Sequence, residues 1–391
     1  MDGCPGPDLV RPVPGADVGG SGPARIPGTI GSAMTPHPGT QRRPLAIGGV
    51  LLASPLVQAA LSGYSDRAMR VIARRHGAAY ALGEVLLDQF VATAKQGRKT
   101  PARLALAVEE HPVGGQLMGS NPDDFAPAAR RLVAEGYDVI DINFGCPVKK
   151  VLGRCRGGFL LSQPVTALEI VGRVRDAVPT EIPVTLKMRR GLDDSPASRD
   201  NFWTIFDGAF ARGAAAITVH GRSVEQRYVG PSDWGFLREV KRHAGDRTVI
   251  GSGDLFSAES CLAMLSETGV DGVSVARGAI GNPWIFQQAL ALLEGRARPL
   301  QPTVHEQRDV LHEHWALAEE LHGEHVAGRS MRKFAIKYAR LHPEHLAVRN
   351  GFVAVKAAAD WQAVLDRHYA VDLPGRDPSG DVDETAACGS D

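Results

Sequence analysis

Eight short apolar runs alternate with helical patterns between residues 55 and 295, and this alternation limits the available folds more than any other feature of the sequence. Apolar strands joined by helices are typical of a parallel sheet that is covered on its faces. Eight such units predict an α/β fold, a closed (β/α)8 TIM barrel. The predicted strands cover residues 56–59, 79–84, 113–119, 139–145, 184–189, 216–221, 248–254 and 272–278.

The clearest predicted helices lie between these strands. They cover residues 123–135, 164–177, 199–211, 234–243 and 257–266. A doubly wound sheet is the main alternative to a barrel, but it would normally carry a GxGxxG turn after its first strand. The sequence has no such turn there, which favours the barrel.

Polar and reactive residues gather at the ends of the predicted strands. Barrel enzymes place their sites at the carboxyl ends of the strands, so these side chains are expected to meet in one mouth. A single strand-end histidine is more often structural than catalytic, but the size of this set predicts an active site. Its members are Glu84, Asn143, Cys146, Lys187, Arg189, His220, Arg222, Asp254 and Arg277, with Gln116 slightly earlier in its strand.

Two glycine-rich loops follow the seventh and eighth strands, at residues 251–254 and 276–282. Barrels commonly bind phosphate at this place, because glycines let backbone N–H groups approach the phosphate oxygens. Arg277 would add charge and a fork of donors. The alternative, ordinary tight turns, is weakened by the position of both loops, so a phosphorylated ligand is predicted.

The chain divides into four predicted regions. A Pro- and Gly-rich arm (1–44) lacks the apolar core of a signal peptide and is predicted to be disordered. The barrel (45–298) is followed by a helical bundle (299–371) and a polar, disordered tail (372–391). The apolar stretch after Arg43 resembles a membrane anchor, but interruptions such as Pro55 favour a buried hairpin and first strand. We therefore expect a cytoplasmic protein without a membrane partner.

The charge balance and the spacing of the cysteines restrict which polyanions or metal ions the chain can bind. The 44 basic and 44 acidic residues cancel, so any polyanion site must be a local patch. Four basic residues at helical spacing form one, namely Arg329, Lys333, Lys337 and Arg340, with Phe334 and Tyr338 nearby. This face is either solvated or a surface for the RNA backbone. The chain has no CxxC motif, and no metal site is expected.

Ordered blocks of the sequence resemble the flavin-dependent tRNA-dihydrouridine synthases, most closely the bacterial B-type branch. The blocks are AALSGYSDRAMR, GGQLMGSNP, INFGCPVKKV, VTLKMRRG, ITVHGRSVEQRYVGPSDW, VIGSGDLFS and RGAIGNPWIF. In the helical region, MRKFAIKYAR resembles the block of the family's tRNA-binding domain. Departures include AALSG for APMAG, GSGD for GNGD, VARG for IGRG, and the basic loop GRCRGG after the cysteine.

The resemblance implies FMN in the barrel mouth, with NADPH as a transient reductant. Gln116 would bind the pyrimidine edge of the flavin, and Lys187 would lie where negative charge gathers in the reduced ring. The isoalloxazine would be lined by backbone of Ala60, Leu61 and Ser62. The ribityl chain and phosphate would be held by His220, Ser252, Gly253, Asp254, Ala276 and Arg277.

The resemblance also implies that specific uridines of tRNA are reduced to 5,6-dihydrouridine. The flavin supplies hydride to carbon 6, and Cys146 of the Gly-Cys-Pro corner would supply the proton to carbon 5. Pro147 restricts Cys146 to extended backbone, which fixes the direction of the thiol. Asn143 and Arg189 would bind the uracil, and the tRNA backbone would meet Arg329, Lys333 and Lys337. A monomer is expected.

Three alternatives remain at this point. The chain could be an FMN barrel reductase for a small molecule, of the dihydroorotate dehydrogenase or old-yellow-enzyme kind, which would not need the basic helical region. It could be a barrel that binds RNA without catalysis. Cys146 itself could be a small buried hydrophobe, the commonest fate of an unmodified cysteine.

Overall fold

The structure is a computed structural model that describes residues 44–93 and 102–378. The predicted arm, apart from Pro44, and residues 379–391 of the predicted tail lie outside the described residues.

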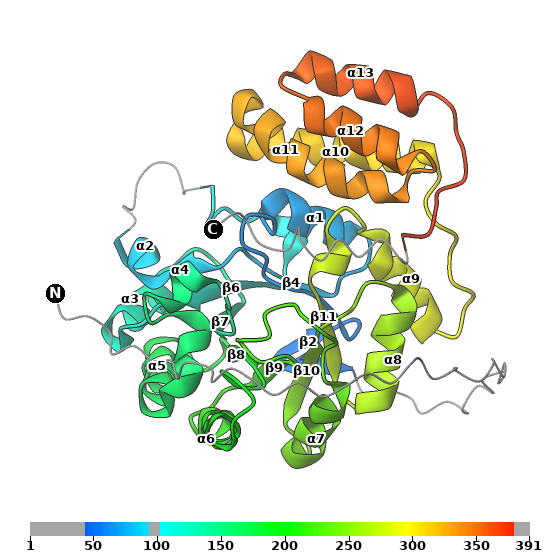
Figure 1. Cartoon of the computed structure of the whole chain (residues 1–391). Coiled ribbons are helices and arrows are strands. Elements are labelled where there is room, and N and C mark those ends of the chain that lie inside the picture. The colour runs from blue at the N-terminus through cyan, green and yellow to red at the C-terminus, as the bar shows by residue number, and fades with distance from the viewer. Residues whose placement is uncertain (1–43, 94–101, 379–391) are drawn as a thin grey trace, which may run out of the picture. The chain divides into compact units, whose positions relative to one another are not determined.

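Eight parallel strands close into a barrel, so the predicted (β/α)8 TIM barrel is confirmed (Figure 1). Closure is made by β4 and β6, where Ala81 pairs with Val113. A short strand, β5 (Leu86–Leu87), continues the line of β4 and pairs with the later part of β6. The barrel strands are β3 (Leu56–Gln58), β4 (Tyr80–Leu82), β6 (Val113–Met118), β7 (Val139–Phe144), β8 (Val184–Arg189), β9 (Ala216–His220), β10 (Thr248–Ser252) and β11 (Gly272–Val275).

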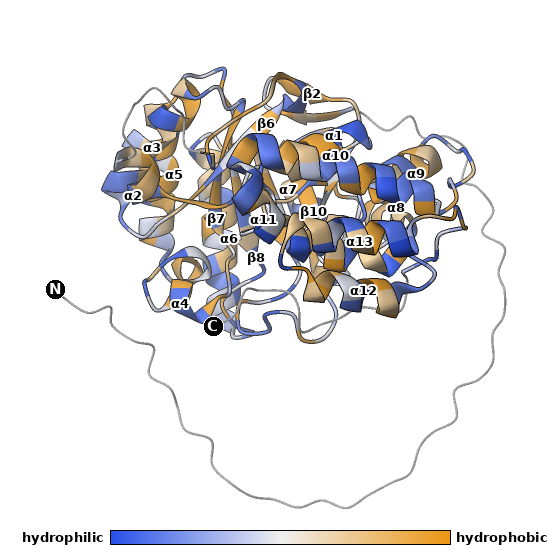
Figure 2. Ribbon diagram, turned by 90° about the horizontal axis from the view of Figure 1, so that it is seen from above, coloured by the Kyte–Doolittle hydropathy of each residue, from blue (hydrophilic) through white to orange (hydrophobic). Residues whose placement is uncertain are grey.

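Helices cover the outside of the barrel, and Figure 2 shows their apolar colouring turned toward the strands and their polar colouring turned away. Local sequence explains where they begin: α3, α5 and α6 have proline in the first turn, which fits a helix start. Asp66, Asp233 and Ser257 cap α1, α7 and α8 by accepting from backbone N–H groups. The helices are α1 (Arg67–Arg75), α2 (Asp88–Thr93), α3 (Pro122–Ala134), α4 (Lys149–Leu152), α5 (Pro164–Ala177), α6 (Pro196–Ala211), α7 (Trp234–Ala244), α8 (Ala258–Thr268) and α9 (Trp284–Leu293).

The predicted buried hairpin forms the floor of the barrel. Strands β1 (Leu45–Ile47) and β2 (Val50–Leu52) pair antiparallel, and their apolar side chains pack under Tyr80 and Val139. The carbonyl of Ala46 accepts from the hydroxyl of Thr248, at the beginning of β10. The amino ends of the strands are thus closed by the hairpin, which leaves the carboxyl ends as the mouth. Within residues 44–93 and 102–378, no helix is long and apolar enough to span a membrane.

The helical region consists of α10 (Val304–His322), α11 (Glu324–Tyr338), α12 (His345–Ala354) and α13 (Ala358–His368), packed around buried aromatic side chains. It contacts the barrel along α1, where Arg67 pairs with Glu320 at 2.8 Å and Arg75 pairs with Glu313. After α13 the chain runs back along the bundle, where the N–H of Arg376 donates to the carbonyl of Leu341 at 2.8 Å. The predicted tail, from residue 372, therefore begins with a segment that is hydrogen-bonded up to this point. Short 3-10 turns lie at Val108–Glu110 (η1), Gly157–Ser162 (η2), Arg277–Ala279 (η3) and Ala339–Leu341 (η4).

One buried ion pair ties α1 to η1. Arg70 donates through Nε to Glu110 at 2.5 Å, and the two side chains are 2 % and 0 % exposed. Arg70 also donates to the carbonyls of Ser65 and Ala105. A charge in such a place is tolerated only while its partner remains.

We expect Glu110→Ala to lower the free energy of unfolding by about 3–5 kcal/mol, because it leaves the Arg70 guanidinium buried without its counter-charge. The matched control is Glu109→Ala, which removes an exposed pair with Arg75 and should cost about 1 kcal/mol or less. Chemical denaturation of both variants measures the difference, and equal losses would contradict this account.

Candidate active site

The register of the strands brings polar side chains into the barrel at successive levels. Gln116 lies beside Asp141, and Asp141 lies beside Thr185. Asn143 pairs with Lys187 one level higher. Residues that are directly paired in a parallel sheet point to the same side, and alternate residues of a barrel strand point inward. The lumen below the mouth is therefore polar at these levels, whereas the outer faces of the same strands are apolar.

A chain of hydrogen bonds runs through this polar interior. The carboxylate of Asp141 accepts from Gln116 Nε2 at 2.6 Å and from Thr185 Oγ1 at 2.5 Å. Gln116 Oε1 accepts from Asn143 Nδ2 at 2.7 Å. Asn143 Oδ1 accepts from the N–H groups of Gly145 and Cys146, at 2.9 and 3.1 Å. The predicted residues Gln116 and Asn143 thus meet Cys146 through a connected network.

Asp141 is a site residue that the sequence analysis missed. It lies inside the apolar run VIDINF, and the signal that could have identified it is an acidic side chain in the middle of a buried strand. Burial raises its pKa to about 6, although the hydrogen bonds from Thr185 and Gln116 and the charge of Lys187 act in the opposite direction.

The Gly-Cys-Pro corner is held from several sides. The carbonyl of Cys146 accepts from the N–H of Gly158 at 3.1 Å, and Arg189 Nε donates to the carbonyl of Gly145 at 3.0 Å. Gly157 has φ +59°, and a Cβ there would lie 2.9 Å from the Cβ of Cys146. The loop after the corner can therefore pack closely only with glycine, and it keeps Cys146 half-buried at the mouth.

Lys187 and His220 face the same space from β8 and β9. Burial lowers the pKa of Lys187 to about 8; repulsion from Arg189 acts in the same direction and attraction to Asp141 opposes it. Burial and the neighbouring cations Arg189 and Lys187 hold the pKa of His220 well below its ordinary value, so it is neutral at pH 7. Within the described residues, Nζ of Lys187 has no hydrogen bond or ion pair. The ammonium is thus available to a ligand.

The guanidinium of Arg189 donates most of its hydrogen bonds to backbone carbonyls of the protein. Besides Gly145, it donates through Nη1 to the carbonyls of Ser223 and Arg227, at 2.8 and 2.7 Å. Burial lowers its pKa to about 10. Its Nη2 group has no hydrogen-bond partner among residues 44–93 and 102–378, which leaves one edge of the guanidinium for a substrate.

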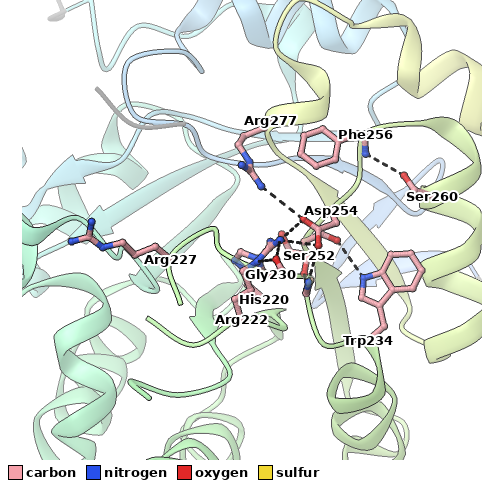
Figure 3. A network of polar contacts seen from close by, with 12 residues as sticks. His220, Arg222, Arg227, Gly230, Trp234, Ser252, Asp254, Phe256, Ser260 and Arg277 are labelled. Atoms are coloured by element: carbon pink, nitrogen blue, oxygen red, sulfur yellow. Dashed lines mark hydrogen bonds and ion pairs between the residues drawn. The ribbon is translucent and has the colours of Figure 1, made fainter. Parts of the chain in front are cut away.

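The two glycine-rich loops follow β10 and β11, and they pack against each other. A Cβ on Gly253 (φ +119°) would lie 2.3 Å from Ser232 Oγ, and one on Gly278 would lie 2.0 Å from the carbonyl of Leu255. The guanidinium of Arg277 lies 4.6 Å from the ring centre of Tyr228 and 5.1 Å from that of Phe256. Figure 3 shows Arg277 near Phe256, with its guanidinium directed toward Asp254.

The carboxylate of Asp254 is neutralised inside the protein. The buried Arg222 donates to both of its oxygens, at 2.8 and 2.9 Å, and the N–H of Ser232 donates to one of them. Asp254 has φ +59°, and Arg277 approaches it at 3.8 Å. Figure 3 shows these groups converging beside His220 and Ser252, whose hydroxyl donates to the carbonyl of Ser274. Arg222, which the sequence placed among the strand-end residues without indicating a role, is the counter-charge that lets a carboxylate lie here.

The loop after β3 carries Ala60, Leu61 and Ser62 at the mouth, and it is contacted by the helical bundle. Lys333 of α11 donates to the carbonyl of Gly63, and its Nζ lies 5.2 Å from the ring centre of Tyr64. Burial lowers the pKa of Lys333, while attraction to Asp66 acts in the opposite direction. Lys333 is thus directed to the barrel as well as being part of the predicted basic face.

The other cations of the predicted basic face also differ in exposure: some are exposed, and others contact the protein. Arg329 is exposed, whereas Arg340 donates to the carbonyl of Ile280 at 3.1 Å, and Lys337 is half-buried. Phe334 and Tyr338, which lie near these cations in the sequence, are both 1 % exposed and so add nothing to an exposed surface. Ala276 lies directly before Arg277, at the beginning of η3.

Further exposed cations lie near Cys146. Lys149, Lys150 and Arg154 follow the Gly-Cys-Pro corner on α4 and the loop after it, and all three are exposed. No ion pair within the described residues involves them. Among these residues, no group of three or more His, Cys, Asp and Glu side chains is arranged to hold a metal ion.

The chain was compared with known proteins. The model of the dihydrouridine synthase (Dus) family matches residues 57–372. A probable tRNA-dihydrouridine synthase of Mycobacterium tuberculosis (strain ATCC 25618 / H37Rv) is 34 % identical over 330 residues, which are 83 % of this chain and 84 % of that protein. The tRNA-dihydrouridine synthase B of Xanthomonas campestris is 33 % identical over 325 residues, which are 83 % of this chain and 91 % of that protein.

The chain also resembles a solved structure of low sequence identity, and this likeness concerns the fold only. Histamine dehydrogenase from Rhizobium sp. 4-9 aligns with a TM-score of 0.51 at 15 % identity, over 74 % of this chain. The chain spans 50 % of the length of that protein.

The close packing around Gly253 can be tested by substitution. Gly253→Ala places a methyl group against Ser232 and His220 in addition to its unfavourable φ, so we expect a loss of roughly 1–3 kcal/mol in unfolding free energy and weaker retention of any ligand in the loop. Gly295→Ala is the control, since Gly295 also has positive φ (+72°) but open space around it. Denaturation and the ligand content of the purified variants are the measurements. A Gly253 variant no worse than its control would rule out the close packing as a requirement.

Proposed function

The chain belongs to the dihydrouridine synthase family, whose members are flavin-dependent oxidoreductases, and from this premise we propose that it reduces specific uridines in tRNA to 5,6-dihydrouridine. The observation that carries the proposal is the family match over residues 57–372, which includes the whole mouth of the barrel. The flavin is FMN, NADPH reduces it between turnovers, and the enzyme acts as a monomer in the cytoplasm.

The residues at the mouth fit FMN. The ammonium of the half-buried Lys187 has no partner within the described residues and suits an electron-rich ring edge. The close-packed glycines 253 and 278, with Arg277 held between two aromatic rings, suit a phosphate. A neutral His220 adds a hydrogen-bonding group without excess charge.

In this proposal FMN supplies the hydride for carbon 6 of the uracil ring. The backbone of the loop at Ala60, Leu61 and Ser62 lines the isoalloxazine, and Gln116 faces its pyrimidine edge. The Gln116 amide already bonds Asp141 and Asn143, so it would offer its second N–H and second lone pair. The ribityl chain and phosphate are held by His220, Ser252, Gly253, Asp254, Ala276 and Arg277.

Lys187 has an electrostatic role in the proposal. A fixed cation in a buried site stabilises negative charge that develops nearby more strongly than it would in water. Because its pKa is about 8, Lys187 keeps its proton at pH 7 and loses it as the pH rises through that value. The site would therefore lose this stabilisation in alkaline solution.

Cys146 is the proposed proton donor to carbon 5. A general acid must be held in a fixed direction within reach of the atom that it protonates. The corner meets this condition through Asn143, Gly158 and Arg189, which together bond four of its backbone groups. Asn143 would offer its remaining N–H to the uracil, and Arg189 would offer Nη2 to a carbonyl.

The cations around the mouth are proposed to bind the RNA backbone. A uridine must leave its stack to enter the barrel, which costs a few kcal/mol that contacts elsewhere on the RNA must offset. Exposed cations are present on both sides of the mouth, with Lys149, Lys150 and Arg154 after Cys146 and Arg329 on α11. Lys337 and Lys333 extend this surface, and Lys333 also supports the loop at Gly63.

The function is tested by following dihydrouridine on unmodified tRNA, with NADPH and the flavin-loaded protein. We expect formation by the wild type and a loss of about 10²–10⁴-fold in Cys146→Ala, because the general acid is missing. Cys261→Ala is the matched control, since Cys261 is a second cysteine that is fully buried in α8. Retained flavin with oxidation by a small enone or dihydroorotate, but never by tRNA, would contradict the proposal.

RNA binding has its own test in the salt dependence of affinity. The double variant Arg154→Glu with Arg329→Glu should weaken binding to tRNA and lower the slope of log K against log salt by about 0.7–0.9 for each lost phosphate contact. Arg242→Glu, an exposed residue on the outer helix α7, is the control and should leave the slope unchanged. Identical slopes in the double variant and the wild type would exclude these cations from the RNA surface. Flavin content should be the same in all three proteins.

A further inference from the structure

We propose that Asp141 is a positioning residue: its carboxylate sets the direction of every hydrogen bond in the chain that ends at the backbone N–H of Cys146. The inference rests on the proposed function, because it concerns the orientation of the thiol that we assign as the proton donor. Asp141 lies below the mouth, and the chain links it to the corner through Gln116 and Asn143.

The two ends of this chain of hydrogen bonds, Asp141 and the backbone N–H groups, determine which group donates at each step. A carboxylate only accepts, so Gln116 must turn its Nε2 toward Asp141 and its Oε1 toward Asn143. Asn143 must then donate through Nδ2 to Gln116, which leaves its Oδ1 for the N–H groups of Gly145 and Cys146. Backbone N–H groups only donate, so inverting either amide would place two donors, or two acceptors, against each other.

Burial makes this direction costly to violate. Asp141, Gln116 and Asn143 are 1 %, 0 % and 7 % exposed, so water has little access to a mismatched pair. A buried polar group that loses its partner costs about 1–3 kcal/mol. Two mismatched amides would therefore cost more than most local rearrangements, and one orientation of the chain is maintained.

The surroundings of Asp141 keep it an acceptor at neutral pH. Thr185 of β8 donates to its second oxygen, Lys187 of the same strand attracts its charge, and the titratable Tyr80 of β4 also interacts with it. Burial raises its pKa to about 6, so the carboxylate is ionised above that pH and gains a proton as the pH falls through it. A protonated carboxyl can donate, and the Asp141 end then no longer imposes the orientation of Gln116.

The corner depends on this chain for its inner support. Gly158 bonds the carbonyl of Cys146 and Arg189 bonds the carbonyl of Gly145, but the N–H groups of both residues are bonded by Asn143. Losing the direction of Asn143 would release these N–H groups and let the corner turn. The position of the thiol would change without loss of the thiol itself.

The substitution Asp141→Asn tests the direction of the hydrogen bonds without changing the size of the side chain. The amide has the size of the carboxyl group, but it can donate as well as accept, so the Asp141 end no longer holds Gln116 to one orientation. Thr185→Val is the matched control: it removes the other hydrogen bond to Asp141 and leaves the chain to Cys146 complete. A merely structural role of Asp141 would make the two variants alike.

The first measurement is the rate of alkylation of Cys146 by iodoacetamide in the flavin-loaded protein at pH 7.5, read by mass spectrometry of its peptide. We expect Asp141→Asn to change this rate by about tenfold and to lower kcat on tRNA by about 10²-fold with KM unchanged, because a displacement of about 1 Å has such an effect on kcat. Thr185→Val should stay within about twofold of wild type in both measurements, since it leaves every bond of the chain in place. Asp141→Asn with wild-type rates, or equal effects in both variants, would overturn the proposal.

A second measurement uses the wild type alone, and it applies even if Asp141→Asn fails to fold. Hydrogen exchange of the peptide that contains Gly145 and Cys146 is followed between pH 5 and 7.5 and corrected for the intrinsic rate. Protection should fall as the pH drops through about 6, and constant protection would overturn the proposal. Alkylation and exchange need no RNA, so a failure to reduce tRNA would count against the proposed function and leave the Asp141 result to stand by itself.

Discussion

The in-register pairing of the barrel strands is the constraint on which the rest of the site depends. From β6 to β10, neighbouring strands align Gln116 with Asp141 and Thr185, Asn143 with Lys187, and Arg189 with His220 and Ser252. A slip of one residue in any of these strands would turn its polar side chains to the outside. The closed barrel prevents such a slip, because every strand is paired on both sides.

The helical bundle contacts the barrel at the loops that we propose to hold FMN. Lys333 bonds the loop after β3 at Gly63, and Arg340 bonds the loop after β11 at Ile280. A Cβ on Gly281 would lie 2.4 Å from the backbone N of Tyr338, so this loop also packs directly on α11. The unit proposed to bind RNA is therefore mechanically connected to both sides of the cofactor site, and substitutions in α11 are expected to affect more than RNA affinity.

The sequence predicted the fold and the strand-end residues because period-2 and period-3.6 patterns report burial directly. It did not predict Asp141 as a site residue, since one acidic residue in VIDINF changes the apolar pattern very little. It also could not show which way α11 faces: spacing places Arg329, Lys333 and Phe334 around a helix, but only packing decides that Lys333 meets Gly63 and that Phe334 is buried. The hydrogen bond of Arg376 was equally hidden, because residues after 372 have a polar composition.

A single-turnover experiment can decide whether Cys146 is the proton donor to a uridine of tRNA, as we propose. The flavin of the purified protein is reduced, the reductant is removed, and the flavin's oxidation by unmodified tRNA is followed by its absorbance. The account predicts rapid oxidation in the wild type and oxidation slower by about 10²-fold or more in Cys146→Ala. Equal rates in the two proteins would contradict the role of Cys146, and the absence of oxidation by any tRNA would contradict the substrate.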